Sequence, residues 1–174
     1  QDITGTVLKE CDPSEITEET AKKCIESFIG EYDQIPPMYS ALKVNGKKLY
    51  ELAREGKVVE RKSRKVQIYD IRIKEMKLPR IRMEVSCSKG TYIRTLCNDV
   101  GEVLGVGGCM ESLLRTKVSR FELKDSMKLA DIEKAKNEGR TEEIILPLDE
   151  VFVEYPKIIV TGRQAQLALS LIHI

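Results

Sequence analysis

The stretch Cys87-Ser88-Lys89-Gly90-Thr91-Tyr92-Ile93-Arg94-Thr95-Leu96 decides the fold of this chain. Before it, apolar residues from Ile81 to Cys87 fall on every second position, which is the period of a half-buried strand. After it, apolar residues from Ile93 to Leu104 follow the three-and-four spacing of a helix with one buried face. The stretch therefore predicts a strand, a turn at Gly90 and a helix that presents Arg94 in its first turn.

An arginine at such a junction can grip a carboxylate or a phosphate with two hydrogen bonds. Its donors form a rigid fork and it does not lose its proton. Tyr92 and Arg94 flank the first apolar residue of the helix, so we place both at the border between core and cleft. The same pattern also fits an exposed arginine beside an ordinary turn glycine, and the stretch alone leaves both interpretations open.

The composition of the 174 residues, 41% hydrophobic and 33% charged, predicts one globular core with room for a small appendage. No apolar run approaches the ~20 residues needed to cross a bilayer, so we expect no membrane contact. The only histidine is His173, and no two cysteines form a C-x-x-C pair. This pattern indicates neither a metal site nor a disulfide framework, and it favours a cytoplasmic protein.

The net charge of +1 conceals a strong asymmetry along the chain. Residues 1–40 carry a local net charge of −6, whereas residues 43–82 carry +9. A polyanion would meet the basic segment and not the average, although a surface with counter-charges folded over it would explain the same numbers.

The remaining patterns place the other elements. Thr17 is the expected N-cap of a helix over 18–29, with Gly30 as its stop. Asn45-Gly46 favours a tight hairpin, and a short helix follows over 49–55. We expect a strand over 66–74 that pairs with 81–87, a strand over 113–121, a helix near 129–136, an extended connection between Pro147 and Pro156, and a new element from Val160.

Three segments, Gln34–Leu52 (QIPPMYSALKVNGKKLYEL), Cys87–Leu96 (CSKGTYIRTL) and Leu113–Phe121 (LLRTKVSRF), resemble the bacterial tRNA pseudouridine synthase B (TruB) family, in the family's own order. The resemblance implies an α+β catalytic core with a mixed, mainly antiparallel sheet and flanking helices. It assigns residues 1–154 to the middle and later part of that catalytic domain. Residues 155–174 would begin a PUA-like RNA-binding domain.

The family resemblance also implies an activity, the isomerisation of uridine 55 in the T arm of tRNA to pseudouridine, with tRNA as the partner and no metal or organic cofactor. In the family, the arginine that matches Arg94 pairs with a nucleophilic aspartate, and the tyrosine that matches Tyr92 supports the pocket. The substrate-binding residues expected from the family pattern and the basic segment are Tyr39, Lys43, Lys47, Lys48, Lys89, Leu113, Arg115 and Lys117.

The family's aspartate motif, GxLDPxATG, does not occur in these residues. Asp12-Pro13 lacks the flanking glycine and the ATG, and we do not expect Asp12 to be catalytic. We therefore expect the chain by itself to be an inactive part of the enzyme. Arg94 should then be exposed, hold an anion, or pair with an acid other than the family's aspartate.

Without the rest of the family's sheet, we expect an exposed sheet edge or apolar surface, and with it poor stability, self-association through that surface or rearrangement. Two other functions stay open at this point. One is an RNA-binding module without chemistry, and the other is a relative of the guide-RNA-dependent pseudouridine synthase, although QIPPMYSALK resembles the bacterial enzyme better.

Overall fold

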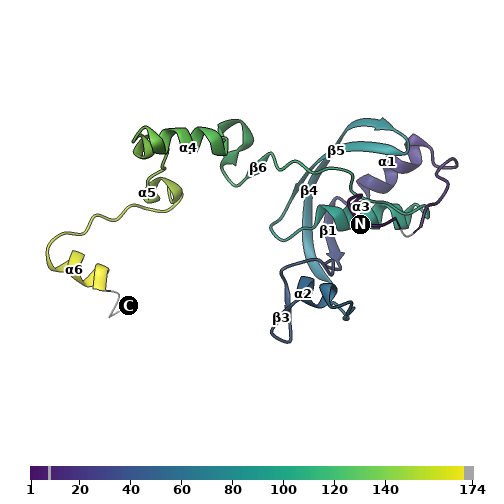
Figure 1. Cartoon of the computed structure of the whole chain (residues 1–174), viewed down its shortest axis with the longest axis horizontal. Coiled ribbons are helices and arrows are strands. Elements are labelled where there is room, and N and C mark those ends of the chain that lie inside the picture. Colours follow the sequence, from purple (N-terminus) through teal and green to yellow (C-terminus); the bar gives the residue numbers. More distant parts are fainter. Residues whose placement is uncertain (8, 171–174) are drawn as a thin grey trace. The chain divides into compact units, whose positions relative to one another are not determined.

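The structure is a computed structural model that describes residues 1–7 and 9–170 (Figure 1). It divides into two compact units, Gln1–Leu114 and Arg115–Ile174. The first unit contains α1 (Glu18–Glu26), β1 (Gly30–Gln34), β2 (Lys43–Val44), β3 (Lys47–Lys48), α2 (Leu49–Arg54), β4 (Arg64–Lys77), β5 (Arg80–Cys87) and α3 (Ile93–Val103).

The centre of the first unit is a three-stranded antiparallel sheet in the order β1-β4-β5. The predicted strand pair is confirmed, with Ile68 opposite Cys87 and Lys77 opposite Arg80. A two-residue turn, in which a cis peptide bond precedes Pro79, joins the two long strands. The predicted α+β fold class is confirmed, whereas β1 was not expected from the sequence.

Two register shifts in β4 keep its apolar residues on one face. The pairing with β5 slips between Ile68 and Asp70 and again between Ile73 and Glu75. An extra residue at each bulge changes the alternation by one, so apolar residues three positions apart still face the same way. The face that results carries Val66, Ile68, Ile71, Ile73 and Met76.

Helices α1 and α3 pack on this face of the sheet and touch each other. Ile25 from α1, Ile68 from β4 and Leu96 from α3 are almost completely buried in the shared core. Each such side chain stabilises the fold by about 1.5–3 kcal/mol relative to an exposed one. The Thr17 cap is confirmed, because its hydroxyl accepts from the Thr20 N–H at 3.2 Å. The predicted end of α1 is wrong: the helix stops at Glu26, and Ile29 is exposed.

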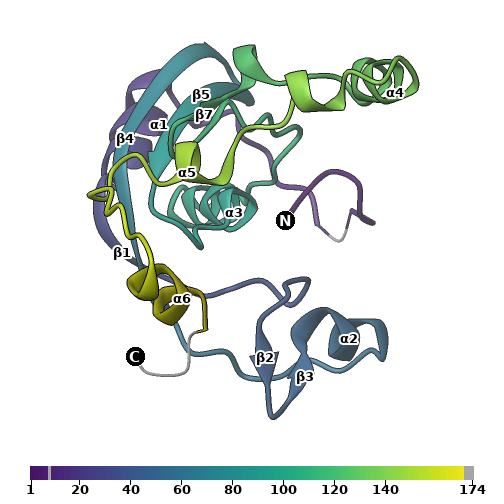
Figure 2. The ribbon, with the colours of Figure 1, turned by 90° about the vertical axis from the view of Figure 1, so that its left-hand side faces the viewer.

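The predicted hairpin and short helix are also confirmed. Strands β2 and β3 pair through the Asn45-Gly46 turn, where both residues have positive φ, 50° and 83°. Helix α2 follows directly after β3 (Figure 2). Its residues Leu49 and Leu52 are buried.

The second unit contains β6 (Lys117–Val118), β7 (Phe121–Glu122), η1 (Leu123–Asp125), α4 (Leu129–Asn137), η2 (Thr141–Glu143), α5 (Leu148–Val151) and α6 (Arg163–Ser170). The predicted strand over 113–121 is wrong, because the chain turns back at Ser119-Arg120 and leaves two-residue strands. The connection between Pro147 and Pro156 is not wholly extended, since it contains α5. The element expected from Val160 includes α6, and residues 171–174, which include His173, lie outside the described part.

Candidate functional site

Arg94 lies in the first turn of α3, where the sequence predicts it, and about a quarter of its side chain remains exposed. One terminal nitrogen, Nη1, lies 3.5 Å from Asp2 Oδ2. The other, Nη2, donates to the backbone carbonyl of Tyr39. Of the three arrangements expected for Arg94, the structure therefore shows the pair with another acid. The guanidinium is held by two segments that lie far apart in the sequence.

Asp2 reaches Arg94 because the first residues pair in parallel with the segment after α3. The Ile3 N–H donates to the Met110 carbonyl at 3.0 Å, and the Met110 N–H donates to the Gln1 carbonyl at 2.9 Å. The Thr4 hydroxyl, which donates to Asp2 Oδ1 at 2.5 Å, lowers the pKa of the Asp2 carboxyl most. The Thr4 N–H and the Arg94 guanidinium act in the same direction, so Asp2 is anionic beside Arg94.

The backbone of Tyr92 is held by the side chain of Gln34, at the end of β1. Gln34 Oε1 accepts from the Tyr92 N–H at 2.8 Å, and Gln34 Nε2 donates to the Tyr92 carbonyl at 3.1 Å. Nε2 also donates to the Tyr32 hydroxyl at 3.2 Å, and that hydroxyl donates to the Asp99 carboxylate. Burial, followed by the bond to Asp99, raises the pKa of Tyr32, which therefore stays protonated.

The predicted lysines of the hairpin do not share one face. Lys43 and Lys48 are directly opposite each other across the β2–β3 ladder, whereas Lys47 is opposite Val44. Lys48 Nζ donates to the Tyr50 hydroxyl at 3.3 Å, which raises the pKa of Lys48. Lys47 Nζ lies 3.8 Å from Glu55 Oε1. Lys43 is exposed and forms no ion pair within the described residues.

The other predicted binding residues are dispersed. Tyr39 is 58% exposed, next to the guanidinium that its carbonyl binds, and Lys89 is exposed in the turn before α3. Leu113 is exposed at the end of the first unit. Arg115 and Lys117 belong to the second unit, and Lys117 pairs with Glu122 at 3.2 Å.

Asp12 has a structural role. Its carboxylate accepts from the Ser14 N–H at 2.9 Å, and this bond is the largest cause that lowers its pKa. Such a side-chain turn is a common use of aspartate before a helix. Within residues 1–7 and 9–170, no group of histidine, cysteine, aspartate and glutamate could hold a metal ion. None of the helices described there is long and apolar enough to span a membrane.

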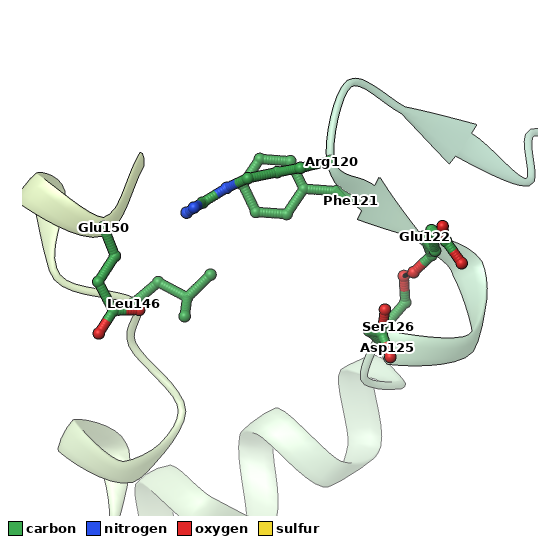
Figure 3. Close-up of a pocket in the computed structure, with 7 residues that line it drawn as sticks. All are labelled: Arg120, Phe121, Glu122, Asp125, Ser126, Leu146 and Glu150. Atoms are coloured by element: carbon green, nitrogen blue, oxygen red, sulfur yellow. Dashed lines mark hydrogen bonds between the residues drawn. The ribbon is translucent and has the colours of Figure 1, made fainter. Parts of the chain in front are cut away.

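Two hollows lie away from the predicted residues. One, of about 380 Å³, is in the second unit (Figure 3), where the Arg120 guanidinium extends over the Phe121 ring and Ser126, Leu146 and three acids complete the lining. The acids are Glu122, Asp125 and Glu150. The other, of about 540 Å³, lies between the acidic outer residues of α1 and the apolar residues Ile71, Ile73 and Met76 of β4.

Sequence reasoning missed the acid and the polar groups around Arg94 and Tyr92: Asp2, Tyr32, Gln34 and Asp99. Only Gln34 had a signal, because it opens the QIPP motif. Tyr32 and Asp99 lie 67 residues apart, and Asp2 is farther still from Arg94, so no local pattern joins them.

Comparison with known proteins shows the family to which the chain belongs. The model of the TruB family pseudouridylate synthase (N terminal domain) matches residues 1–93, and that of the tRNA pseudouridylate synthase B C-terminal domain matches residues 94–153. The tRNA pseudouridine synthase B of Lachnoclostridium phytofermentans is 52% identical over 78% of this chain and 47% of its own length. That of Clostridium tetani is 48% identical over 90% of this chain and 53% of its own. The chain thus spans about half the length of these curated relatives.

Solved structures show the same fold. A chain in the crystal structure of a Cbf5-Nop10-Gar1 complex is similar with a TM-score of 0.58 and 26% identity, over 75% of this chain and 35% of that one. A second, in an H/ACA RNP bound to a substrate RNA containing 2'-deoxyuridine, has a TM-score of 0.52 and 23% identity, over 71% and 32%. The family models match most of the sequence, and the described fold agrees with them. The chain belongs to the TruB family of pseudouridylate synthases.

Proposed function

We propose that the protein to which this chain belongs isomerises uridine 55 in the T arm of tRNA to pseudouridine. The observation that carries the proposal is the half-buried guanidinium of Arg94, fixed between Asp2 and the Tyr39 carbonyl at the start of α3. A guanidinium held in this way can orient a second carboxylate and keep it ionised. The tRNA pseudouridine synthases among its relatives support this assignment.

In the proposed reaction, an aspartate attacks the target nucleoside, and the uracil detaches, rotates and reattaches through carbon. Arg94 lowers the pKa of this nucleophile and fixes its orientation in a partly dry pocket. Tyr92 supports the pocket from the N-cap position of α3. The target uridine must first leave its stack, so the pocket receives an extruded base.

The RNA partner would be held by charge around the pocket. The segment 43–82 has a local net charge of +9, and Lys43 is exposed at its beginning. Phosphate contacts of this kind supply most of the affinity in protein–nucleic acid complexes. Tyr39, whose backbone carbonyl accepts from Arg94, is exposed, and a base can stack on its ring. We assign Lys47, Lys48, Lys89, Arg115 and Lys117 to phosphate contacts and Leu113 to packing beside the base.

The chain of 174 residues is proposed to be inactive alone, because the family's aspartate motif is not among them. Residues 1–154 would belong to the catalytic domain, and residues 155–174 would begin a PUA-like RNA-binding domain. All five cysteines are free thiols, which is compatible with our proposal of a cytoplasmic enzyme.

Tritium release from C5-labelled uridine in a T-arm stem-loop tests the proposal. Two proteins are compared: the 174-residue chain, and a chimaera in which it follows the aspartate-containing N-terminal segment of the Clostridium tetani synthase. We expect turnover by the chimaera and none by the chain alone. Turnover by the chain alone would refute its inactivity. A chimaera that binds the stem-loop but releases no tritium would favour the RNA-binding module instead.

A further inference from the structure

The start of α3 has an unusual support. Its N-cap residue, Tyr92, makes no side-chain hydrogen bond to the helix. The first N–H groups of a helix need partners, which an N-cap side chain normally supplies in part. Here the side chain of Gln34, 58 residues earlier, binds both the N–H and the carbonyl of Tyr92. The helix that carries Arg94 is therefore fixed from outside itself.

The contacts fix the orientation of the Gln34 amide. The Tyr92 N–H can only donate and its carbonyl can only accept, so Oε1 must face the first and Nε2 the second. The second proton of Nε2 goes to the Tyr32 hydroxyl, which in turn donates to Asp99 of the same helix. Gln34 is 1% exposed, and all its amide protons have partners. A buried and fully satisfied network of this kind holds one geometry.

The segment that follows Gln34 also contacts the guanidinium of Arg94. Gln34 binds the backbone two residues before Arg94, and the carbonyl of Tyr39, five residues after Gln34, accepts from Arg94 Nη2. The Tyr92 carbonyl that Gln34 binds is the one that accepts from the Thr95 and Leu96 N–H groups, both at 3.0 Å. A shift of Gln34 would therefore displace the first turn and Arg94 together.

We propose that Gln34 is a positioning residue, which aligns Arg94 by fixing the Tyr92 backbone. The inference rests on the proposed function for its kinetic consequence. According to this proposal, the first residue of the QIPP motif positions Arg94 and does not contact the RNA. The burial of its side chain excludes direct contact with a substrate.

The kinetic test uses Gln34→Met in the chimaera described above. Methionine keeps the length of the side chain but removes all three hydrogen bonds. We expect the single-turnover rate at saturating enzyme to fall about tenfold to a hundredfold, with RNA affinity unchanged. Ile25→Val, a core change in α1 that Arg94 does not contact, serves as the control for lost stability and should leave this rate unchanged.

A double-mutant cycle shows whether Gln34 acts through Arg94. In an Arg94→Lys background, Gln34→Met should add less than about a twofold loss, because coupled residues are not additive. Fully additive losses, or a loss from Gln34→Met no larger than that from Ile25→Val, would overturn the proposal.

A measurement on the 174-residue chain separates this proposal from the proposed function. Gln34→Met should speed hydrogen exchange at the Leu96 amide by about tenfold relative to the amides of β4, which report any loss of global stability. Unchanged exchange would refute the role of Gln34 even if the chimaera is active. Faster exchange in an inactive chimaera would leave Gln34 as the support of Arg94 and refute only the reaction.

Discussion

The carboxylate of Asp2 is the acid that Arg94 contacts, and its charge depends on pH. The bonds from Thr4, together with Arg94, hold its pKa below the ordinary value of 3.8. A lowered carboxyl pKa stabilises the folded state above the ordinary pKa, and this contribution is lost as the pH falls through the folded value. The support that Asp2 gives to the structure around Arg94 should therefore vanish in acid.

We predict that Asp2→Asn lowers the melting temperature at neutral pH, and that the difference from the wild type shrinks as the pH falls below 3.8. Thermal unfolding followed by circular dichroism at several pH values measures both. Glu133→Gln is the control, since Glu133 is exposed on α4 and forms no ion pair within the described part. A difference that persists at low pH would show that Asp2 acts through its shape and not its charge.

At the scale of single elements, the lysines of the β2–β3 hairpin differ in the charged groups that lie near them. Lys43 is exposed and forms no ion pair among the described residues, whereas Lys47 lies near Glu55. The bond from Lys57 and then the charge of Lys47 lower the pKa of Glu55, which is therefore anionic and offsets part of the lysine charge. The two positions should differ in how strongly they attract a phosphate.

We predict that Lys43→Glu weakens binding of a T-arm stem-loop more than Lys47→Glu does. Gel-shift titrations at several salt concentrations would show this, with the salt slope reduced by about one for each lost phosphate contact. If changing Lys43, Lys47 and Lys48 together to glutamate leaves binding unaltered, the hairpin does not belong to the RNA surface.

The elements also show what could be predicted from the sequence. The apolar residues of the long strands and of α3 recur with clear strand and helix periods. Asn45-Gly46 is a pair that readily adopts the positive φ values of the turn. The segment 113–121 alternates too, but a Ser119 with φ of 52° reverses the chain, and no glycine or asparagine marks that turn. Strand β1 is short and polar, so its residues have no apolar signal to find.

The site was predictable only in part for a related reason. Arg94 and Tyr92 belong to a local motif, but Asp2 and Gln34 meet them through the tertiary fold. Their positions depend on the ladder with Met110 and on the β1–β4 pairing, which single-sequence patterns do not contain.

For the whole first unit, the sheet edges are the feature with the largest consequence. Strands β1 and β5 are the outer strands, and within the described residues neither has a partner on its outer side. An open edge offers unpaired N–H and carbonyl groups to another chain. We propose self-association of the 174-residue chain through such an edge.

Analytical ultracentrifugation over a range of concentrations tests this proposal. We expect the sedimentation coefficient to rise with concentration as dimers form. A monomer at all concentrations, with one cooperative melting transition, would contradict it. Shortening the chain after Leu114 provides a comparison, because it removes the second compact unit and leaves the sheet intact.

The ladder between Asp2 and Met110 also bears on how the protein folds during synthesis. The two residues are separated by more than a hundred positions, and the entropy cost of closing a loop grows with its length. The β4–β5 hairpin and α3 use nearby residues and can form early, whereas Asp2 must wait until Met110 leaves the ribosome. The acid that Arg94 contacts is thus made well before the segment that holds it beside Arg94.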